Sequence, residues 1–183
     1  MIAVTDHNTI TGGIETFRLC KEEKLDVAVI VGSEIKTNMG DVIGLFLSQE
    51  ITSSDIFEVI DEIRRQDGLV LVPHPFKGHK FEELRNILEQ IDMVEALNSR
   101  SFTTFKQTCL LKTLNKSLVG CSDAHFPQEI GLCRSIINSD FLSVEEMKHL
   151  LTDPSNVKAT GLFGNKLLQS FSHVVKVLKT RSY

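Results

Sequence analysis

The sequence predicts an α/β protein, and two observations lead to this prediction. Short runs rich in β-branched residues alternate with segments whose apolar residues recur at helical spacing. No linker or low-complexity tract interrupts this alternation over the 183 residues. Alternating strands and helices favour a parallel sheet, either open with helices on both faces or closed as a barrel.

Predicted strands begin at the first residues of the chain. Ile2-Ala3-Val4 is typical of the end of a strand and leads directly into Thr5-Asp6-His7. Later strands are expected at 27–31, 42–47, 69–72, 93–97, 117–121 and 133–137. In parallel α/β folds, functional sites lie at the carboxyl ends of the strands, so the residues near those ends are the candidates for chemistry.

Predicted helices lie between these strands. The clearest covers 54–66, where apolar residues recur at i, i+3, i+4 and i+7, and Gly68 is expected to take the left-handed conformation that ends the helix. Other helices are expected at 14–23, 81–90, 102–114, 144–151 and 166–179. Ser143 and Glu146 have the spacing of a capping box, which predicts that a helix begins between them.

The composition predicts one soluble domain over residues 1–183. Hydrophobic residues make up 42% of the chain, enough for a core at this length, and charged residues make up 24%. The 20 Lys and Arg against 24 Asp and Glu give a net charge of −4, which provides no basic surface for the backbone of duplex nucleic acid. We therefore expect no duplex nucleic-acid partner.

Three features of the sequence predict a cytoplasmic protein with no membrane contact. Its apolar runs are shorter than the roughly 20 residues that span a bilayer. The first residues show neither the basic nor the long apolar region of a signal peptide. The cysteines Cys20, Cys109, Cys121 and Cys133 are widely spaced and form no CxxC pair, so neither a zinc ribbon nor a disulfide framework is expected.

Residues of metal-ligand type lie next to nearly every predicted strand. They are His7, Glu34, Asp41, His74, Asp123 and His125. Imidazole and carboxylate ligands together suit divalent transition ions such as Zn²⁺, Mn²⁺ or Fe²⁺. The ligands are too many for one tetrahedral ion, so the pattern predicts a cluster with bridging carboxylates. Such clusters hydrolyse phosphoesters by holding the phosphate oxygens and lowering the pKa of a bridging water.

Two polar residues follow the strand expected at 93–97. Asn98 and Arg100 are candidates for contacting the substrate, and Arg100 suits phosphate because a guanidinium can donate two parallel hydrogen bonds. An ordinary structural role fits equally well: Asn98 would end the strand, and Arg100 would be a charged residue at the start of a helix.

The candidate ligands also have ordinary structural interpretations. His7 alone could be a surface histidine and Asp6 a helix cap. His74, between two prolines, could belong to a turn, Glu34 could be a solvated residue, and Asp41 could be a turn residue after a glycine. Their shared placement at predicted strand ends favours one site over several coincidences.

Four segments, in order, resemble the motifs of the PHP superfamily (polymerase and histidinol phosphatase). They are Thr5-Asp6-His7-Asn8-Thr9-Ile10, Gly32-Ser33-Glu34-Ile35, Pro73-His74-Pro75 and Gly120-Cys121-Ser122-Asp123-Ala124-His125, the last followed by Glu129-Ile130-Gly131. The resemblance covers essentially the whole chain and is nearest to the stand-alone metal-dependent phosphoesterases. It implies a distorted (β/α)7 TIM-like barrel with up to three metal ions at the carboxyl ends of the strands.

The resemblance also implies roles for the ligands. His7 and His125 would share one ion, and Glu34 would bridge two others, of which Asp123 would bind one and His74 the other. Asp123 and His125 are thereby the expected catalytic residues.

Further roles follow from the same resemblance. Asp41 stands where the family often has a histidine, so it is expected to serve as an oxygen ligand instead. Asn98 and Arg100 match the family's Asn-x-Arg segment near the substrate. Asp6 is expected beside the ligands rather than on an ion.

One motif of the family is not found in this sequence. The family begins with a strand ending in His-x-His and a helix, and the strand at Ile2 matches the one that follows them. We therefore expect the chain to begin one β/α unit late, to hold fewer than three ions, and to show weak or no phosphatase activity. The incomplete barrel would expose a strand edge, which favours self-association or pairing with another chain.

The leading hypothesis is a cytoplasmic phosphoesterase that uses a metal-bound hydroxide. Its expected substrate is a small phosphorylated molecule, such as a nucleotide, a sugar phosphate or an amino-alcohol phosphate. The alternative is a non-catalytic domain of the same fold with a binding or structural role. A metal-dependent amidohydrolase on the same barrel is disfavoured because the catalytic Lys or His-x-His of that type is not identifiable.

Overall fold

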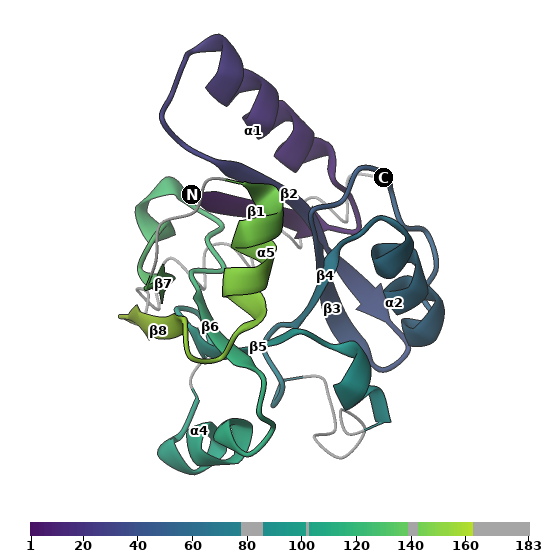
Figure 1. The fold of residues 1–183 in the computed structure, drawn as a ribbon, viewed down its shortest axis with the longest axis vertical. Coiled ribbons are helices and arrows are strands. Elements are labelled where there is room, and N and C mark those ends of the chain that lie inside the picture. The colour runs from purple at the N-terminus through teal and green to yellow at the C-terminus, as the bar shows by residue number, and fades with distance from the viewer. Residues whose placement is uncertain (78–85, 102, 139–142, 163–183) are drawn as a thin grey trace, which may run out of the picture. The chain divides into compact units, whose positions relative to one another are not determined.

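The computed structural model describes residues 1–77, 86–101, 103–138 and 143–162. The chain divides into two compact units, Met1–Val94 and Glu95–Tyr183, and both have mixed α/β structure (Figure 1). The expected helix at 166–179 and the first half of the one at 81–90 lie outside the described residues. The prediction that 1–183 form one domain stays a prediction.

The first unit is built on a mixed sheet. Its elements are β1 (Ile2–His7), α1 (Thr11–Glu22), β2 (Val29–Thr37), β3 (Gly40–Leu45), α2 (Ile56–Arg65), β4 (Leu69–Val72), the short 3-10 helix η1 (Leu88–Gln90) and the start of β5 (Met93–Asn98). Strands β1 to β6 follow one another in the sheet in sequence order. β1 pairs with β2 and β4 with β5 in parallel, whereas β3 is antiparallel to both β2 and β4.

The direction of β3 corrects the prediction of a parallel sheet. Asn38 and Met39 turn the chain straight from β2 into β3, and Gly40 takes a φ of 113° that few other residues adopt. The side chain of Thr37 accepts a hydrogen bond from the N–H of Met39 at 3.2 Å within this turn. As a result, the amino end of β3 lies beside the carboxyl end of β2, and Asp41 is paired in register with Lys36.

Strand β2 is longer than the sequence predicts. The prediction ends this strand at Val31, but β2 continues to Thr37 because β1 pairs with it as far as Glu34 and β3 pairs with it from Gly32 to Thr37. Glu34 therefore lies inside a strand that is paired on both sides, and not in the loop after it.

Helix α2 buries one apolar stripe, as predicted. Ile56, Val59, Ile60 and Ile63 are each at most 1% exposed. The helix lies beside β3 and β4 (Figure 1). Its first turn is capped by Asp55, whose carboxylate accepts hydrogen bonds from the N–H groups of Phe57 and Glu58.

The end of α2 differs from the prediction. Asp67, and not Gly68, takes the left-handed conformation, with a φ of 55°. The N–H of Gly68 donates to the carbonyl of Ile63 at 2.9 Å. Glycine is needed at position 68 because a Cβ there would lie 2.7 Å from the carbonyl oxygen of Leu45.

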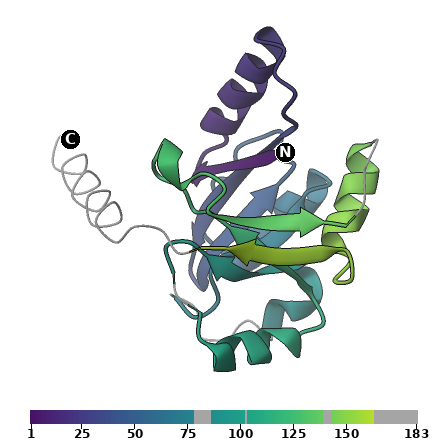
Figure 2. The ribbon, with the colours of Figure 1, turned by 90° about the vertical axis from the view of Figure 1, so that its left-hand side faces the viewer.

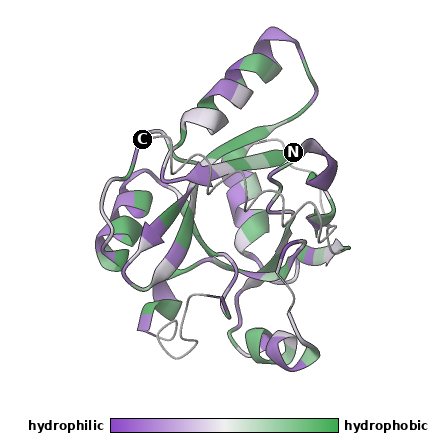
Figure 3. Ribbon diagram, turned by 180° about the vertical axis from the view of Figure 1, so that it is seen from behind, coloured by the Kyte–Doolittle hydropathy of each residue, from purple (hydrophilic) through white to green (hydrophobic). Residues whose placement is uncertain are grey.

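Helix α1 is much more exposed than α2. Gly13 is its buried residue, while Ile14 and Phe17 are 49% and 41% exposed. The Nζ of Lys21 lies 4.5 Å from the centre of the Phe17 ring. The helix contacts β1 and β2, and apolar and polar residues alternate along it (Figure 3).

The second unit continues β5 and adds smaller elements. They are α4 (Phe105–Lys112), β6 (Ser117–Cys121), the 3-10 helix η2 (Pro127–Glu129), β7 (Cys133–Ile137), α5 (Val144–Thr152) and β8 (Val157–Gly161). β7 and β8 form an antiparallel pair (Figure 2), of which the sequence predicts only β7. The predicted start of α5 is confirmed, since the Ser143 side chain accepts a hydrogen bond from the N–H of Glu146 at 3.1 Å.

Within the described ranges, no helix combines the length and apolar character that crossing a lipid bilayer requires.

The stripe on α2 yields a stability prediction. Ile60→Ala should lower the free energy of unfolding by about 2–5 kcal/mol, because it removes a side chain that is 1% exposed and leaves a cavity. Phe57→Ala on the same helix is the control, since Phe57 is 45% exposed. Urea denaturation measures both changes, and equal losses for the two variants would contradict the described packing.

Candidate functional site

The candidate site of the first unit is centred on Glu34 in β2. Its side chain is 11% exposed. Parallel pairing sets His7, the last residue of β1, directly beside Glu34 in register. His7 Nδ1 lies 3.6 Å from Glu34 Oε2, and the N–H of Asn8 donates to the Glu34 carbonyl at 2.9 Å.

His74 approaches Glu34 from the carboxyl end of β4. Its Nε2 lies 3.0 Å from Glu34 Oε1, and its side chain is 9% exposed. An ionised carboxylate can only accept, so Nε2 carries the hydrogen of this bond. His74 has a φ of 68°, which is unusual for a residue with a Cβ, and such backbone strain is concentrated at functional sites.

Opposing influences act on the pKa of Glu34. Burial, the largest of them, raises this pKa. The hydrogen bond with His74 and the charges of His7, His74 and Lys77 lower it, and together they outweigh burial. The pKa of Glu34 is therefore lowered, and its carboxylate is ionised at neutral pH despite its burial.

Asp41 completes a group that can hold a metal ion. One ligand atom each from Glu34, Asp41 and His74 lies within 4.8 Å of the others. Two ligand atoms about 2.1 Å from one ion are at most about 4.2 Å apart, so a small inward movement brings all three onto one ion. Asp41 joins the group because β3 is antiparallel, which carries its amino end to this part of the sheet.

The ligand types of this group fit a divalent transition ion. Two carboxylates balance the charge of a dication, and one imidazole favours a transition metal over Mg²⁺ or Ca²⁺. An ion bound by His74 Nε2 would displace the hydrogen that now bonds to Glu34. The group thus has the ligand types and the charge that binding of a divalent ion requires, and a spacing close to it.

Asp123 and His125 form a second polar group, in the second unit. Asp123 has a φ of 48°, so the chain turns at this residue and is not extended. The turn still brings them together: His125 Nδ1 lies 3.0 Å from the Asp123 carbonyl oxygen and 3.6 Å from its Oδ1. The carbonyl accepts, so Nδ1 donates and Nε2 is the acceptor nitrogen of the ring.

Asn98 lies at the end of β5 and is 3% exposed. Its Nδ2 donates to both carboxylate oxygens of Glu95 at 3.1 Å and to Asp123 Oδ2 at 3.3 Å. Glu95 was not among the predicted site residues. Its position as a carboxylate within an otherwise apolar strand is the feature of the sequence that could have identified it. Burial, followed by the charge and hydrogen bonding of Glu95, raises the pKa of the Cys121 thiol well above its usual range.

Arg100 makes a buried ion pair with Glu129, which the sequence analysis placed within a motif but gave no role. Arg100 Nη1 lies 2.9 Å from Glu129 Oε1 and 2.7 Å from Oε2. The two side chains are 10% and 0% exposed. The role of Arg100 in binding substrate stays a prediction.

Asp6 precedes His7 at the end of β1 and is exposed. Its carboxylate lies against the first turn of α1, where a Cβ at Gly12 would overlap it. The expected role of Asp6 beside the ligands stays a prediction.

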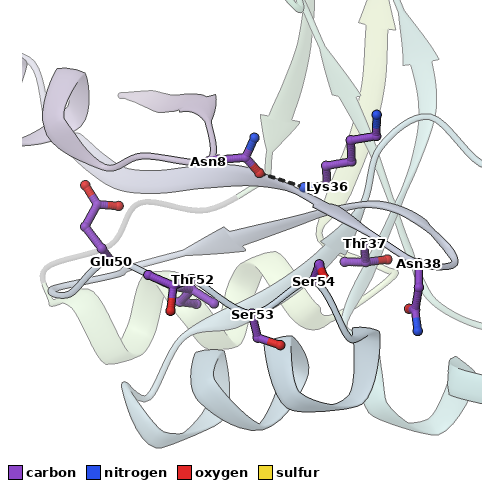
Figure 4. A pocket seen from close by; sticks show the side chains of 9 residues that line it. Asn8, Lys36, Thr37, Asn38, Glu50, Thr52, Ser53 and Ser54 are labelled. Atoms are coloured by element: carbon purple, nitrogen blue, oxygen red, sulfur yellow. Dashed lines mark hydrogen bonds between the residues drawn. The ribbon is translucent and has the colours of Figure 1, made fainter.

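A separate hollow of the first unit has a volume of about 660 Å³. Its lining consists of Asn8, Lys36, Thr37, Asn38, Glu50, Ile51, Thr52, Ser53 and Ser54 and does not include the metal-ligand group (Figure 4). Asn8 Oδ1 accepts a hydrogen bond from the N–H of Lys36 at 2.9 Å at one side of it. Several of its polar side chains are used within the fold, as when Asn38 bonds to Asp55 at 3.0 Å.

The structure therefore groups the predicted residues by unit. His7, Glu34, Asp41 and His74 converge in the first unit. Asn98, Asp123 and His125 converge in the second. The sharing of ions among these residues stays a prediction.

In comparisons with known proteins, no family model matches the chain. Two uncharacterized proteins of Methanocaldococcus jannaschii are similar to it. MJ1587 is 47% identical over 77 residues, which are 42% of this chain and 44% of that protein. MJ0417 is 34% identical over 167 residues, covering 81% of this chain and 65% of that protein, so the chain spans less than two thirds of either relative.

Solved structures are similar in fold at low sequence identity. A two-domain protein of Bacteroides vulgatus, described as containing a predicted PHP-like metal-dependent phosphoesterase, has a TM-score of 0.69 at 19% identity and is matched over 88% of this chain and 55% of its own. This chain and that protein are similar in fold. PsfC of Pseudomonas syringae has a TM-score of 0.64 at 17% identity, over 94% of this chain and 81% of its own.

The lowered pKa of Glu34 yields a prediction for metal-free protein. Its ionised carboxylate should stabilise the native state above the ordinary pKa of 4.5, and this contribution should disappear as the pH falls through the lowered value. Urea denaturation of the unmodified chain and of Glu34→Gln, between about pH 3 and pH 7, measures it. The difference in unfolding free energy should be largest at the upper end. A difference that grows toward low pH would contradict the assigned direction.

The ligand group yields a second prediction. His74→Ala and Asp41→Asn should each weaken binding of Mn²⁺ or Zn²⁺ by at least about tenfold, since replacing even the hydrogen-bonding partners of ligands has effects of that size. Isothermal titration calorimetry measures the affinity. His149→Ala is the matched control, because His149 is exposed on α5, and it should bind metal unchanged. Equal affinity in all four proteins would exclude this group as the binding site.

Proposed function

We propose that this chain is a divalent-metal-dependent phosphoesterase. The observation that carries the proposal is the convergence of Glu34, Asp41 and His74 within 4.8 Å of one another in the first unit. The PHP-like fold supports it, since one protein of this fold is described as a predicted metal-dependent phosphoesterase. The cofactors proposed are ions of Zn, Mn or Fe, fewer than the three that the complete family site would hold.

The ion and the side chains would contribute different parts of the reaction. When bound, a divalent ion polarises a phosphoryl oxygen and makes a water more acidic. Glu34 and Asp41 offer carboxylates for the ion, and His74 offers a ring nitrogen beside them. The burial of Glu34 keeps water away from that carboxylate and so strengthens its electrostatic contacts.

Asp123 and His125 are proposed to take part in the same chemistry. His125 Nε2, the acceptor nitrogen of its ring, can bind an ion or hold a proton, because Nδ1 donates to the Asp123 carbonyl. Asn98 orients the Asp123 carboxylate by donating to it. The proposed substrate is a small phosphorylated molecule, such as a nucleotide, a sugar phosphate or an amino-alcohol phosphate.

A direct assay tests the proposed reaction. The chain loaded with Mn²⁺ should hydrolyse an aryl phosphate or a bis-aryl phosphate at most weakly, and a chelator should abolish that turnover. His74→Ala should reduce kcat/KM by at least about tenfold, because it removes a ligand, whereas His149→Ala should retain it. Matched amide substrates serve as a comparison. Turnover that survives the chelator, or that favours the amide, would contradict a metal-dependent phosphoesterase.

A second candidate function is binding of another chain. β1 stands first in the order of the six-stranded sheet and, within the described ranges, pairs with β2 alone, so its outer edge can accept a strand. The exposed Ile14 and Phe17 on the adjacent α1 favour the same role. A binding domain would keep its partner, including a second copy of itself, when His74 and Asp123 are replaced by Ala, whereas an enzyme would lose activity.

A further inference from the structure

Glu129 is a fully buried carboxylate at the end of the short helix η2. Its residue exposure is 0%. A carboxylate in this position is costly unless its oxygens accept hydrogen bonds and its charge is balanced. The structure supplies both kinds of partner, and the partners indicate what the residue does.

The first partner is the guanidinium of Arg100. It contacts both oxygens of Glu129, at 2.9 Å and 2.7 Å, and the Arg100 side chain is itself only 10% exposed. This pair satisfies the charge of Glu129. The Nη1 of Arg100 is therefore bonded to a carboxylate of the protein itself.

The second set of partners is the backbone that follows Asp123. Glu129 Oε2 accepts from the N–H of His125 at 2.9 Å and from the N–H of Phe126 at 3.2 Å. The carboxylate therefore fixes the peptide on which the His125 ring is mounted. Asp123, two residues earlier, has the strained φ of 48°, so this turn needs external support to keep its shape.

Residues at the end of β5 hold the other side of the same turn. Asn98 donates to the Asp123 carboxylate at 3.3 Å, and the Ser99 hydroxyl donates to the Ser122 carbonyl at 2.5 Å. The N–H of Arg100 in turn donates to Asn98 Oδ1 at 2.7 Å. Arg100 thus joins the two supports, through its backbone on one side and its guanidinium on the other.

We propose that Glu129 is a positioning residue that holds the turn of Asp123 and His125 in the shape that presents their side chains to a metal ion or substrate. Arg100 is its counter-ion and acts through it, in place of the direct contact with substrate phosphate that the sequence predicts. This inference rests on the proposed function for its link to metal, but its structural part concerns the chain alone.

The test compares Glu129→Gln with a matched ion pair elsewhere. Arg64 and Asp92 in the first unit lie 2.8 Å apart, and Asp92 also accepts from a backbone N–H, that of Val70, at 2.7 Å. Asp92→Asn therefore removes a carboxylate charge that, like the charge of Glu129, is paired with an arginine and accepts a backbone N–H. The double variant Arg100→Gln/Glu129→Gln removes both charges, which keeps the test usable if Glu129→Gln alone folds poorly.

Three properties are measured for each variant of the 1–183 chain. Amide hydrogen exchange at His125 and Phe126, measured by NMR without metal, should be at least about tenfold faster in Glu129→Gln and in the double variant. The ¹⁵N signature of the Nδ1–H tautomer of His125 should weaken in both. Calorimetric titration with Mn²⁺ should show affinity reduced about 10- to 100-fold. Asp92→Asn should lower thermal stability and leave all three readouts unchanged.

The outcomes separate the two proposals. Unchanged exchange and tautomer in Glu129→Gln and in the double variant would overturn the positioning role, as would equal changes in Asp92→Asn. If the unmodified chain binds no Mn²⁺, the proposed function fails, while the exchange and tautomer results still decide the role of Glu129. Recovery of thermal stability in the double variant without recovery of slow exchange would support positioning over a purely structural role.

Discussion

The burial of the Glu34 carboxylate inside a doubly paired strand is the constraint on which the candidate site depends. A buried carboxylate must be paired, and the sheet brings the partners from three directions. Parallel β1 brings His7, antiparallel β3 brings Asp41, and the end of β4 brings His74. Fold and site are therefore specified together, because a shift of one residue in any of these pairings would turn a ligand to the other face of the sheet.

Much of the fold could be predicted because its signals are local. β4, β6 and β7 occupy the predicted residues, and the stripe on α2 is buried as its spacing indicates. The direction of β3 and the length of β2 could not be predicted, since both depend on which strand pairs with which. The same limit applies to the site. His74 and Glu34 could be found as ligand types, but the contact of Arg100 with Glu129 joins residues 29 positions apart and leaves no local pattern.

Both units place polar groups of chemical interest in strained or buried positions. His74 and Asp123 have positive φ angles, and Glu34, Glu95 and Glu129 are buried carboxylates, each held by side chains whose hydrogen bonds fix an orientation. Such features cost stability, and they persist where a function requires a fixed geometry. The exposed α1 and the edge strand β1 contrast with this order, and we propose that they serve association with other chains.

We propose that Glu34, Asp41 and His74 hold a divalent ion. A crystal of the chain grown with Mn²⁺, with diffraction measured at the manganese absorption edge, tests this proposal. If these residues bind the ion, an anomalous peak will lie within bonding distance of one atom from each of the three side chains. An ordered site without such a peak, or manganese bound only by other residues, would contradict it.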